Sequence, residues 1–357
     1  MKTQRIQALT GIRAIAAMMV FLYHNRKYWR DDIPHALLKL LNEFHTGVAV
    51  FFVLSGFLIA YTYREKPLAS GKEYGKYLLV RFARIFPMYL LILTASYIDN
   101  GFPGTPETIL TYTLVHGSSD TWNLHGIAQA WSLTVEMSFY LLAPFIYVLT
   151  KKSIGKTLLI LIGFLGLTLA VGYGWHWWNG NRYGYFYPAN FVFNSTFAGR
   201  FPEFFSGMLL GHYLLKHQEN GLANKKYLTL TGGIVSLAVI YAISCFEPNI
   251  YGHGTEVAGG LILRNVVFPA TVAILLYGLI TERTWVARFL GSPPMVLLGN
   301  ASFIFYLIHI SYVNMKLRNL YLFPDRNFIL LWIVSIILYL IIEKPLYEWL
   351  KGMIKKL

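Results

Sequence analysis

The sequence predicts an all-α, polytopic membrane protein: a bundle of about ten transmembrane helices with both termini in the cytoplasm. Three observations predict it. Of the 357 residues 55% are hydrophobic, and the mean hydropathy is +0.47. Only 13% are charged, whereas soluble domains carry about 25%. Finally, lysine and arginine concentrate in alternate loops between apolar segments, as the positive-inside rule requires.

Ten apolar segments are long enough to serve as membrane-spanning helices, because about 20 residues cross a bilayer. The predicted spans are residues 8–25, 46–62, 83–99, 131–150, 156–175, 197–215, 227–246, 257–281, 296–318 and 327–350. A weaker apolar run over 108–115 is too short to span, and we expect it to lie at the membrane interface.

The basic residues set the topology. With the N-terminus inside, the outside loops over 99–129 and 247–256 hold no lysine or arginine. The inside groups are Lys2 and Arg5, Arg64 to Arg84, Lys151 to Lys156, Lys216 to Lys226, Arg283 and Arg288, and Lys351 to Lys356. The exceptions are Arg26, Lys27, Arg30, Lys39, Arg182, Arg318 and Arg326. This pattern explains most of the net charge of +14, so no nucleic-acid partner is expected.

The chain shows no repeat, low-complexity tract or linker, so we expect a single transmembrane domain over residues 1–357 with no appended extracytoplasmic domain. Its one cysteine, Cys245, excludes an internal disulfide and a cysteine-cluster metal site, and no metal is predicted. The first apolar segment contains Arg13 and lacks a small-residue cleavage site, so it is predicted to be a retained helix.

That first segment carries an arginine near one end and a histidine at the other. Arg13 and His24 are eleven positions apart, so on an α-helix they lie within roughly 20° of one stripe and about 16 Å apart along the axis. A charged group in hydrocarbon costs at least ~2.5 kcal/mol unless it faces protein or water. The shared stripe therefore predicts a polar seam inside a bundle. The alternative for Arg13 is an anchor that extends to the lipid headgroups.

Polar residues also occur in the second and third predicted spans. Ser55 and Gly56 in the second favour close helix packing. In the third, Arg81 and Arg84 are three positions apart and share a helix face. They are either ordinary positive-inside anchors or a cytoplasmic site for an anionic ligand, since guanidinium groups suit phosphate.

The fourth and sixth spans begin outside and carry carboxylates. Ser132 and Glu136 are four positions apart, which places Glu136 about one and a half turns below the outer surface. Glu136 is either the structural partner of an arginine such as Arg200 or the carboxylate that orients His24 and raises its basicity. Arg200 and Glu203, three positions apart in the sixth span, could also pair with each other.

His309 follows Ser302 by seven positions in the ninth span, on nearly the same helix face. A lone helical histidine is usually structural, and a role in the site is the alternative. Two clusters of intramembrane groups result. The inner, basic cluster is Arg13, Arg81 and Arg84, and the outer, mixed cluster is His24, Glu136, Arg200 and Glu203. Such a pair of clusters suits a reaction whose donor and acceptor come from opposite sides.

Taken in order, these motifs resemble the membrane acyltransferase-3 family. The resemblance rests on Arg13 with His24 after ten intervening residues, followed by FFVLSGF, RFARIFP, WSLTVE, RFPEFFSG and LGNASFIFYLIH. Each string alone is a weak signal, whereas the ordered set runs from Leu9 to about Pro345. The resemblance implies a ten-helix bundle that uses acetyl-coenzyme A, or another acyl-CoA, to O-acylate extracytoplasmic carbohydrate such as O-antigen, capsule or exopolysaccharide.

Carried over position by position, the family's motif residues are Arg13, His24, Arg81, Arg84, Trp131, Ser132 and Glu136. Our own assignment of roles goes further. The expected acyl-CoA contacts are Arg13, Ser55, Arg81, Arg84, Trp131 and Ser132, and the expected catalytic residues are His24 and Glu136. The candidates for the acceptor side are Arg200, Glu203 and His309.

The resulting hypothesis is an O-acetyltransferase of the bacterial cytoplasmic membrane, in which His24 takes the proton of a sugar hydroxyl and Glu136 orients it. Acyl-CoA is expected as the donor substrate, with no permanently bound cofactor, and the bilayer and a sugar acceptor are the other partners. The acceptor, the acyl chain, direct or acyl-enzyme transfer, and the oligomeric state, a homo-oligomer included, stay open. The alternative is a secondary transporter or permease for a sugar-type substrate, with the same groups as proton relays or ligands.

Overall fold

The computed structural model describes residues 3–29, 31–62, 70–180, 183–217, 227–247, 252–320 and 324–357. These residues are almost entirely helical and form no β-strand, only an isolated bridge between Ser119 and Tyr185. The predicted all-α class is therefore confirmed. Some basic residues used for the topology lie outside the described residues, namely Lys2, Arg30, Arg64, Lys66, Arg182, Lys225 and Lys226.

Six helical segments of the described residues are long and apolar enough to cross a membrane. They are His35–Thr62, Gly71–Asn100, Ala128–Lys152, Ile154–Asn179, Ala258–Thr281 and Asn327–Lys356. Two further apolar helices, Leu228–Ser244 and Pro293–Ile308, are shorter. The full set of ten spans and the cytoplasmic placement of both termini stay predictions.

The chain divides into two compact units, each assembled from two stretches that are distant in sequence. Unit 1 is Met1–Arg64 with Pro202–Tyr306, and unit 2 is Glu65–Phe201 with Leu307–Leu357. The two later boundaries fall inside the helices α9 (Phe197–His217) and α14 (Pro293–Ile308). The expected single domain stays a prediction.

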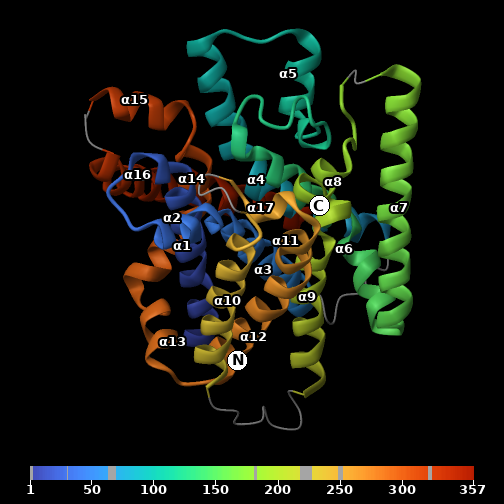
Figure 1. Ribbon diagram of the computed structural model, residues 1–357, viewed down its shortest axis with the longest axis vertical. Coiled ribbons are helices and arrows are strands. Elements are labelled where there is room, and N and C mark those ends of the chain that lie inside the picture. Colours follow the sequence, from blue (N-terminus) through green and yellow to red (C-terminus); the bar gives the residue numbers. More distant parts are fainter. Residues whose placement is uncertain are drawn as a thin grey trace. The chain divides into compact units, whose positions relative to one another are not determined.

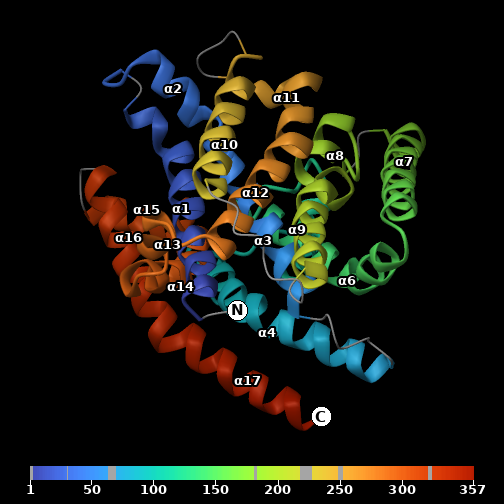
Figure 2. The same cartoon turned by 90° about the horizontal axis from the view of Figure 1, so that it is seen from below.

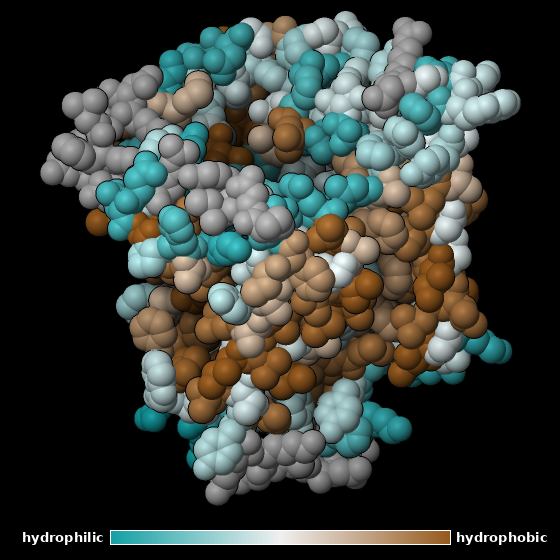
Figure 3. Space-filling view, viewed as in Figure 1, coloured by the Kyte–Doolittle hydropathy of each residue, from teal (hydrophilic) through white to brown (hydrophobic). Residues whose placement is uncertain are grey.

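In unit 1, α1 packs against α3, α12 and α13, and α10 packs along α12 (Figure 1). The remaining described elements of this unit are short. The bounds are α1 Thr3–Asn25, η1 Arg26–Tyr28, α2 His35–Asn42, η2 Phe44–Thr46, α3 Gly47–Thr62, α10 Leu228–Ser244, η5 Gly254–Glu256, α11 Ala258–Ile262, η6 Leu263–Val267, α12 Phe268–Thr281 and α13 Trp285–Leu290. Apolar side chains gather on the surface over α10 and α12 (Figure 3), as expected for lipid-facing helices.

Glycines allow the helices of unit 1 to approach closely. A Cβ at Gly56 in α3 would lie 1.9 Å from the Phe204 carbonyl oxygen, and one at Gly207 in α9 would lie 1.8 Å from that of Val53. The Phe52 and Phe204 rings stack beside this contact, with centroids 4.4 Å apart. Gly56 therefore serves helix packing, as the sequence favoured, because small residues let membrane helices touch backbone to backbone.

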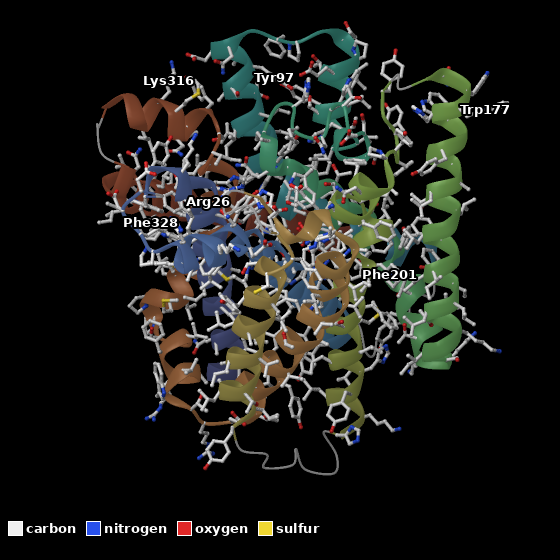
Figure 4. The ribbon with its side chains drawn as sticks, in the orientation of Figure 1. Arg26, Tyr97, Trp177, Phe201, Lys316 and Phe328 are labelled. Carbon is white, nitrogen blue, oxygen red and sulfur yellow. The ribbon has the colours of Figure 1, made fainter. Side chains whose placement is uncertain are left out.

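Unit 2 is built around the long helices α4, α6 and α7, and α17 lies along α4 (Figure 2). Trp177 on α7 projects away from its helix (Figure 4) and is 88% exposed. The bounds are α4 Gly71–Asn100, α5 Thr105–Tyr112, η3 His116–Ser118, η4 Ala128–Ala130, α6 Trp131–Lys152, α7 Ile154–Asn179, α8 Ala189–Ser195, α15 Tyr312–Leu320, α16 Pro324–Leu338, η7 Tyr339–Glu343 and α17 Lys344–Lys356.

Two helix boundaries differ from the prediction. The third helix begins at Gly71 rather than at residue 83, because the Ser70 hydroxyl accepts the Glu73 backbone N–H and caps it before the apolar run starts. The ninth span is broken, since α14 ends at Ile308 and α15 begins at Tyr312. The short run at 108–115 falls within α5 and the turn after it, which is too short to span.

Candidate functional site

Arg13 and His24 both lie on α1, so the predicted helix that joins them is present. The Arg13 guanidinium lies over the Phe51 ring of α3, 5.9 Å from its centroid. Arg13 thus faces the protein, which disfavours its interpretation as a headgroup anchor. Ser55, one turn further along α3, is half-buried.

A group of rings surrounds the end of α1 that carries His24. The half-buried His24 ring meets the Tyr23 ring edge-on, with centroids 4.6 Å apart. The Tyr23 ring also contacts His45 at 5.3 Å and His253 at 5.4 Å, and its hydroxyl shares a hydrogen bond of 3.1 Å with His253 Nε2. His45 and His253 lie 5.6 Å apart. Three histidines from three segments therefore meet around Tyr23.

Glu43 supplies a carboxylate to this group. It is 1% exposed, its Oε1 accepts the Gly254 backbone N–H at 2.7 Å, and its Oε2 lies 3.7 Å from His45 Nδ1. Among the described residues, no group of three or more His, Cys, Asp or Glu side chains is arranged to hold a metal ion. Glu43 and His45 thus form a close pair of titratable side chains, in which a proton on one affects the other.

Arg26, labelled in Figure 4, is the first residue of η1 and also contacts Tyr23. Its guanidinium lies over the Tyr23 ring at 4.3 Å, donates to the Tyr23 carbonyl at 2.5 Å and also donates to Asn42 Oδ1. Burial, followed by the charge of Arg26, lowers the pKa of His253 from its usual value. His253 is therefore stabilised as a neutral imidazole, which leaves one ring nitrogen able to accept a hydrogen bond.

In unit 2, Arg81 lies between two tyrosine rings. Its guanidinium is 5.6 Å from the Tyr77 centroid and 5.3 Å from that of Tyr140. The Tyr140 hydroxyl donates to Glu136 Oε1 at 2.6 Å, and Arg84 also acts electrostatically on Tyr140. The sequence placed the arginines and Glu136 in separate inner and outer clusters, whereas Tyr140 connects Arg81 with Glu136. Arg81 therefore contacts the middle of α6.

A proline explains part of this geometry. Pro144 interrupts α6 and has no N–H to donate to the Tyr140 carbonyl four residues earlier. The Tyr77 hydroxyl donates to that carbonyl at 3.0 Å instead, and the Tyr74 hydroxyl donates to the Leu141 carbonyl at 2.9 Å. These bonds tie α4 to α6 beside Arg81, because buried carbonyl groups need a donor.

Three other predicted residues of unit 2 are Trp131 and Ser132, at the start of α6, and Arg200, in the first turn of α9. The buried Arg200 lies over the Trp131 ring at 5.6 Å and donates to the Asn194 carbonyl at 2.9 Å. Ser132 donates to the Gln129 carbonyl at 2.9 Å. Trp131 and Ser132 thus contact protein groups, and their expected role in acyl-CoA binding stays a prediction.

His309 and Glu203 were predicted on the acceptor side. His309 is buried and is the first residue of the turn after α14, which ends at Ile308, so its role stays a prediction. Its carbonyl accepts the Asn314 side-chain N–H, which holds this turn. Glu203, on α9 in unit 1, is fully buried. His24 and Glu136 belong to different units, so their pairing stays a prediction.

A family comparison decides the class of protein. The family described as an acyltransferase domain matches residues 6–343 of this chain. The chain belongs to the acyltransferase-3 family. The match covers every residue predicted for the site, from Arg13 to His309.

Curated relatives carry consistent names. Acyltransferase MdmB of Streptomyces mycarofaciens is 29% identical over 164 residues, which cover 42% of this chain and 41% of that protein. The Staphylococcus aureus (strain COL) protein named "Putative O-acetyltransferase SACOL0978" is 24% identical over 345 residues, which cover 88% of this chain and 51% of that protein. The matches thus span about half the length of these relatives or less. No solved structure matches the chain.

His116, in η3 outside the predicted spans, provides a pH test of the structure. Burial lowers the pKa of His116 to about 4, whereas an unfolded histidine titrates near 6.5. Between these values the unfolded chain binds a proton that the folded chain does not, so stability should fall by roughly 3 kcal/mol as pH drops from about 6.5 to 4 and then level off. We expect His116→Gln to remove this part of the pH dependence.

The measurement is the unfolding midpoint of the detergent-purified protein between pH 7 and pH 4, with His35→Gln as a control at an exposed histidine. The same pH dependence in His116→Gln and the unaltered protein would contradict the structure of this loop.

Proposed function

We propose that this chain is an integral-membrane O-acyltransferase of the bacterial cytoplasmic membrane that moves an acetyl group from cytoplasmic acetyl-CoA to a hydroxyl of a cell-surface sugar or polysaccharide. The single observation that carries the proposal is the family match over residues 6–343, supported by relatives named as acyltransferases. The match favours acyl transfer over the transporter alternative, which would use the same intramembrane groups.

We assign the acid–base chemistry to His24. A sugar hydroxyl is a poor nucleophile at neutral pH, and a placed histidine that accepts its proton typically supplies 10²–10⁴-fold. The assignment is supported by the Tyr23 ring, which contacts both His24 and His45, and by the Glu43 carboxylate beside His45. Glu136 is kept as the proposed carboxylate partner of His24, although the contact described for it is the Tyr140 hydroxyl.

We assign donor binding to Arg81 and Arg84, with Arg13 along the path to His24. A guanidinium keeps its charge when it lies over aromatic rings, and guanidinium groups suit phosphate oxygens. Arg81 has this environment between Tyr77 and Tyr140. Ser55, Trp131 and Ser132 complete the proposed acyl-CoA contacts, and Arg200, Glu203 and His309 the proposed acceptor side.

The base assignment predicts that His24→Ala lowers transfer by roughly 10²–10⁴-fold while acyl-CoA binding persists, because the proton acceptor is lost and the donor site is not. The measurement is incorporation of labelled acetyl from acetyl-CoA into glycan by membranes that contain equal amounts of inserted protein. His35→Ala, at an exposed histidine of the same unit, is the control. Undiminished transfer by His24→Ala would remove His24 from its role.

The donor assignment predicts that Arg81→Ala or Arg84→Ala weakens acyl-CoA binding by about tenfold or more, since one charged hydrogen bond is worth about 1.5–3 kcal/mol. Isothermal titration of coenzyme A into the purified protein measures this. Lys72→Ala, at an exposed cation on the same helix, should bind normally. Unchanged affinity in both arginine variants would exclude this donor site.

A further inference from the structure

One imidazole–carboxylate pair of unit 1 lies beside Tyr23, the residue next to His24, and was not among the residues predicted from the sequence. His45 and Glu43 come from the segment that joins α2 to α3. The His45 side chain is 20% exposed and the Glu43 side chain 1% exposed. The carboxylate is therefore hidden behind an imidazole that solvent or substrate can still reach. Glu43 Oε2 lies 3.7 Å from His45 Nδ1, a separation at which the protonation states of the two side chains are coupled.

We propose that His45, backed by Glu43, is a second proton-transfer residue, which donates a proton to the departing sulfur of coenzyme A. The proposal rests on the acyl transfer proposed above. It deepens that function by dividing the acid and base roles between two histidines that both contact the Tyr23 ring.

The step balances in atoms and protons. The acceptor oxygen bonds to the acyl carbon and its proton passes to neutral His24, while the carbon–sulfur bond breaks and the thiolate takes a proton from protonated His45. The products are the ester and free coenzyme A thiol, with no net proton released. The proton left on His24 then replaces the one lost by His45 before the next turnover.

His45 is better suited to the acid role than His253. The His45 imidazole has a carboxyl group beside it that can take part in its proton exchange, because Glu43 Oε2 lies within 4 Å of His45 Nδ1. His253 has a lowered pKa and its Nε2 is engaged by the Tyr23 hydroxyl. His253 is instead a positioning residue that fixes Tyr23, the residue adjacent to His24.

The charges around the pair come from several elements, and all of them contribute to its titration. Arg26, Arg264 and Glu247 act on Glu43, and Glu256 acts on Tyr23 and His253. Among the described residues, the titratable and charged groups that contact or act on the pair are Tyr23 from α1, Arg26 from η1, Glu247 and His253 from the segment before η5, and Arg264 from η6. His24 and Glu256 act one step further away, through Tyr23.

The test is the pH–rate profile of acetyl transfer by full-length protein in proteoliposomes, with acetyl-CoA as donor. A required acid gives an alkaline limb, because activity falls when that group loses its proton. We expect His45→Gln to lower kcat by roughly tenfold or more, to leave the KM for acetyl-CoA near that of the unaltered protein, and to abolish the alkaline limb. A merely structural role would scale the whole profile and leave the limb.

Glu43→Gln provides a second, conservative variant, because its amide oxygen can still accept the Gly254 N–H. We expect its alkaline limb to move to lower pH, since the imidazolium loses its carboxylate, and Glu43→Asp to move it back part of the way. His35→Gln is the matched control and should behave as the unaltered protein. If His45→Gln does not fold, the limb of Glu43→Gln decides the question.

An unaltered profile in His45→Gln, or an unshifted limb in Glu43→Gln, overturns the inference. The outcome is distinguishable from failure of the proposed function. If His24→Ala is inactive while His45→Gln is normal, only the second histidine is excluded. If membranes with the unaltered protein give no acetylated product, the acyltransferase proposal itself fails.

Discussion

Charged side chains inside an apolar helical protein must find partners, and several arginines among the described residues lie against aromatic rings. Arg13 lies over Phe51, Arg81 between Tyr77 and Tyr140, and Arg200 over Trp131. Each such contact is worth roughly 0.5–2 kcal/mol, with the larger values where water is excluded. An aromatic face stabilises a guanidinium without neutralising it, so the charge stays available to an anionic ligand.

A proline in α6 affects the surroundings of Arg81. Pro144 leaves the Tyr140 carbonyl without its helical donor, and the Tyr77 hydroxyl fills the vacancy. The two tyrosines that flank Arg81 are thus held by a hydrogen bond that exists only because the helix contains a proline. Tyr140 connects this feature to chemistry, since its own hydroxyl contacts Glu136. The proline in α6 therefore helps to position the tyrosines that surround Arg81 in the candidate donor site.

The sequence predicted the helices well because apolar length and charge placement are local properties. It predicted Arg13 and His24 on one helix for the same reason. The Glu136–Tyr140 contact could have been predicted from the sequence, since the two residues are four positions apart on a helix. The break after Ile308 was not, because the turn at residues 309–311 contains no proline or glycine to mark it.

The group around His24 could not be predicted in this way. Glu43 and Gly254 are separated by 211 positions, and Tyr23 and His253 by 230. No local pattern brings such residues together, and only the packing of α1, α2 and the segment around η5 does so. The π-helical segments η6 and η7 were also missed, because one added residue per turn leaves no clear signature in hydropathy.

We propose that the donor enters from the cytoplasm and that the acceptor is modified on the other side of the membrane. Sealed membrane vesicles of defined orientation test this sidedness, with labelled acetyl-CoA supplied on one face and glycan acceptor on the other. We expect acetylated glycan only when acetyl-CoA is on the cytoplasmic face and the acceptor on the opposite face. Transfer that requires both substrates on the same face would contradict the proposed sidedness.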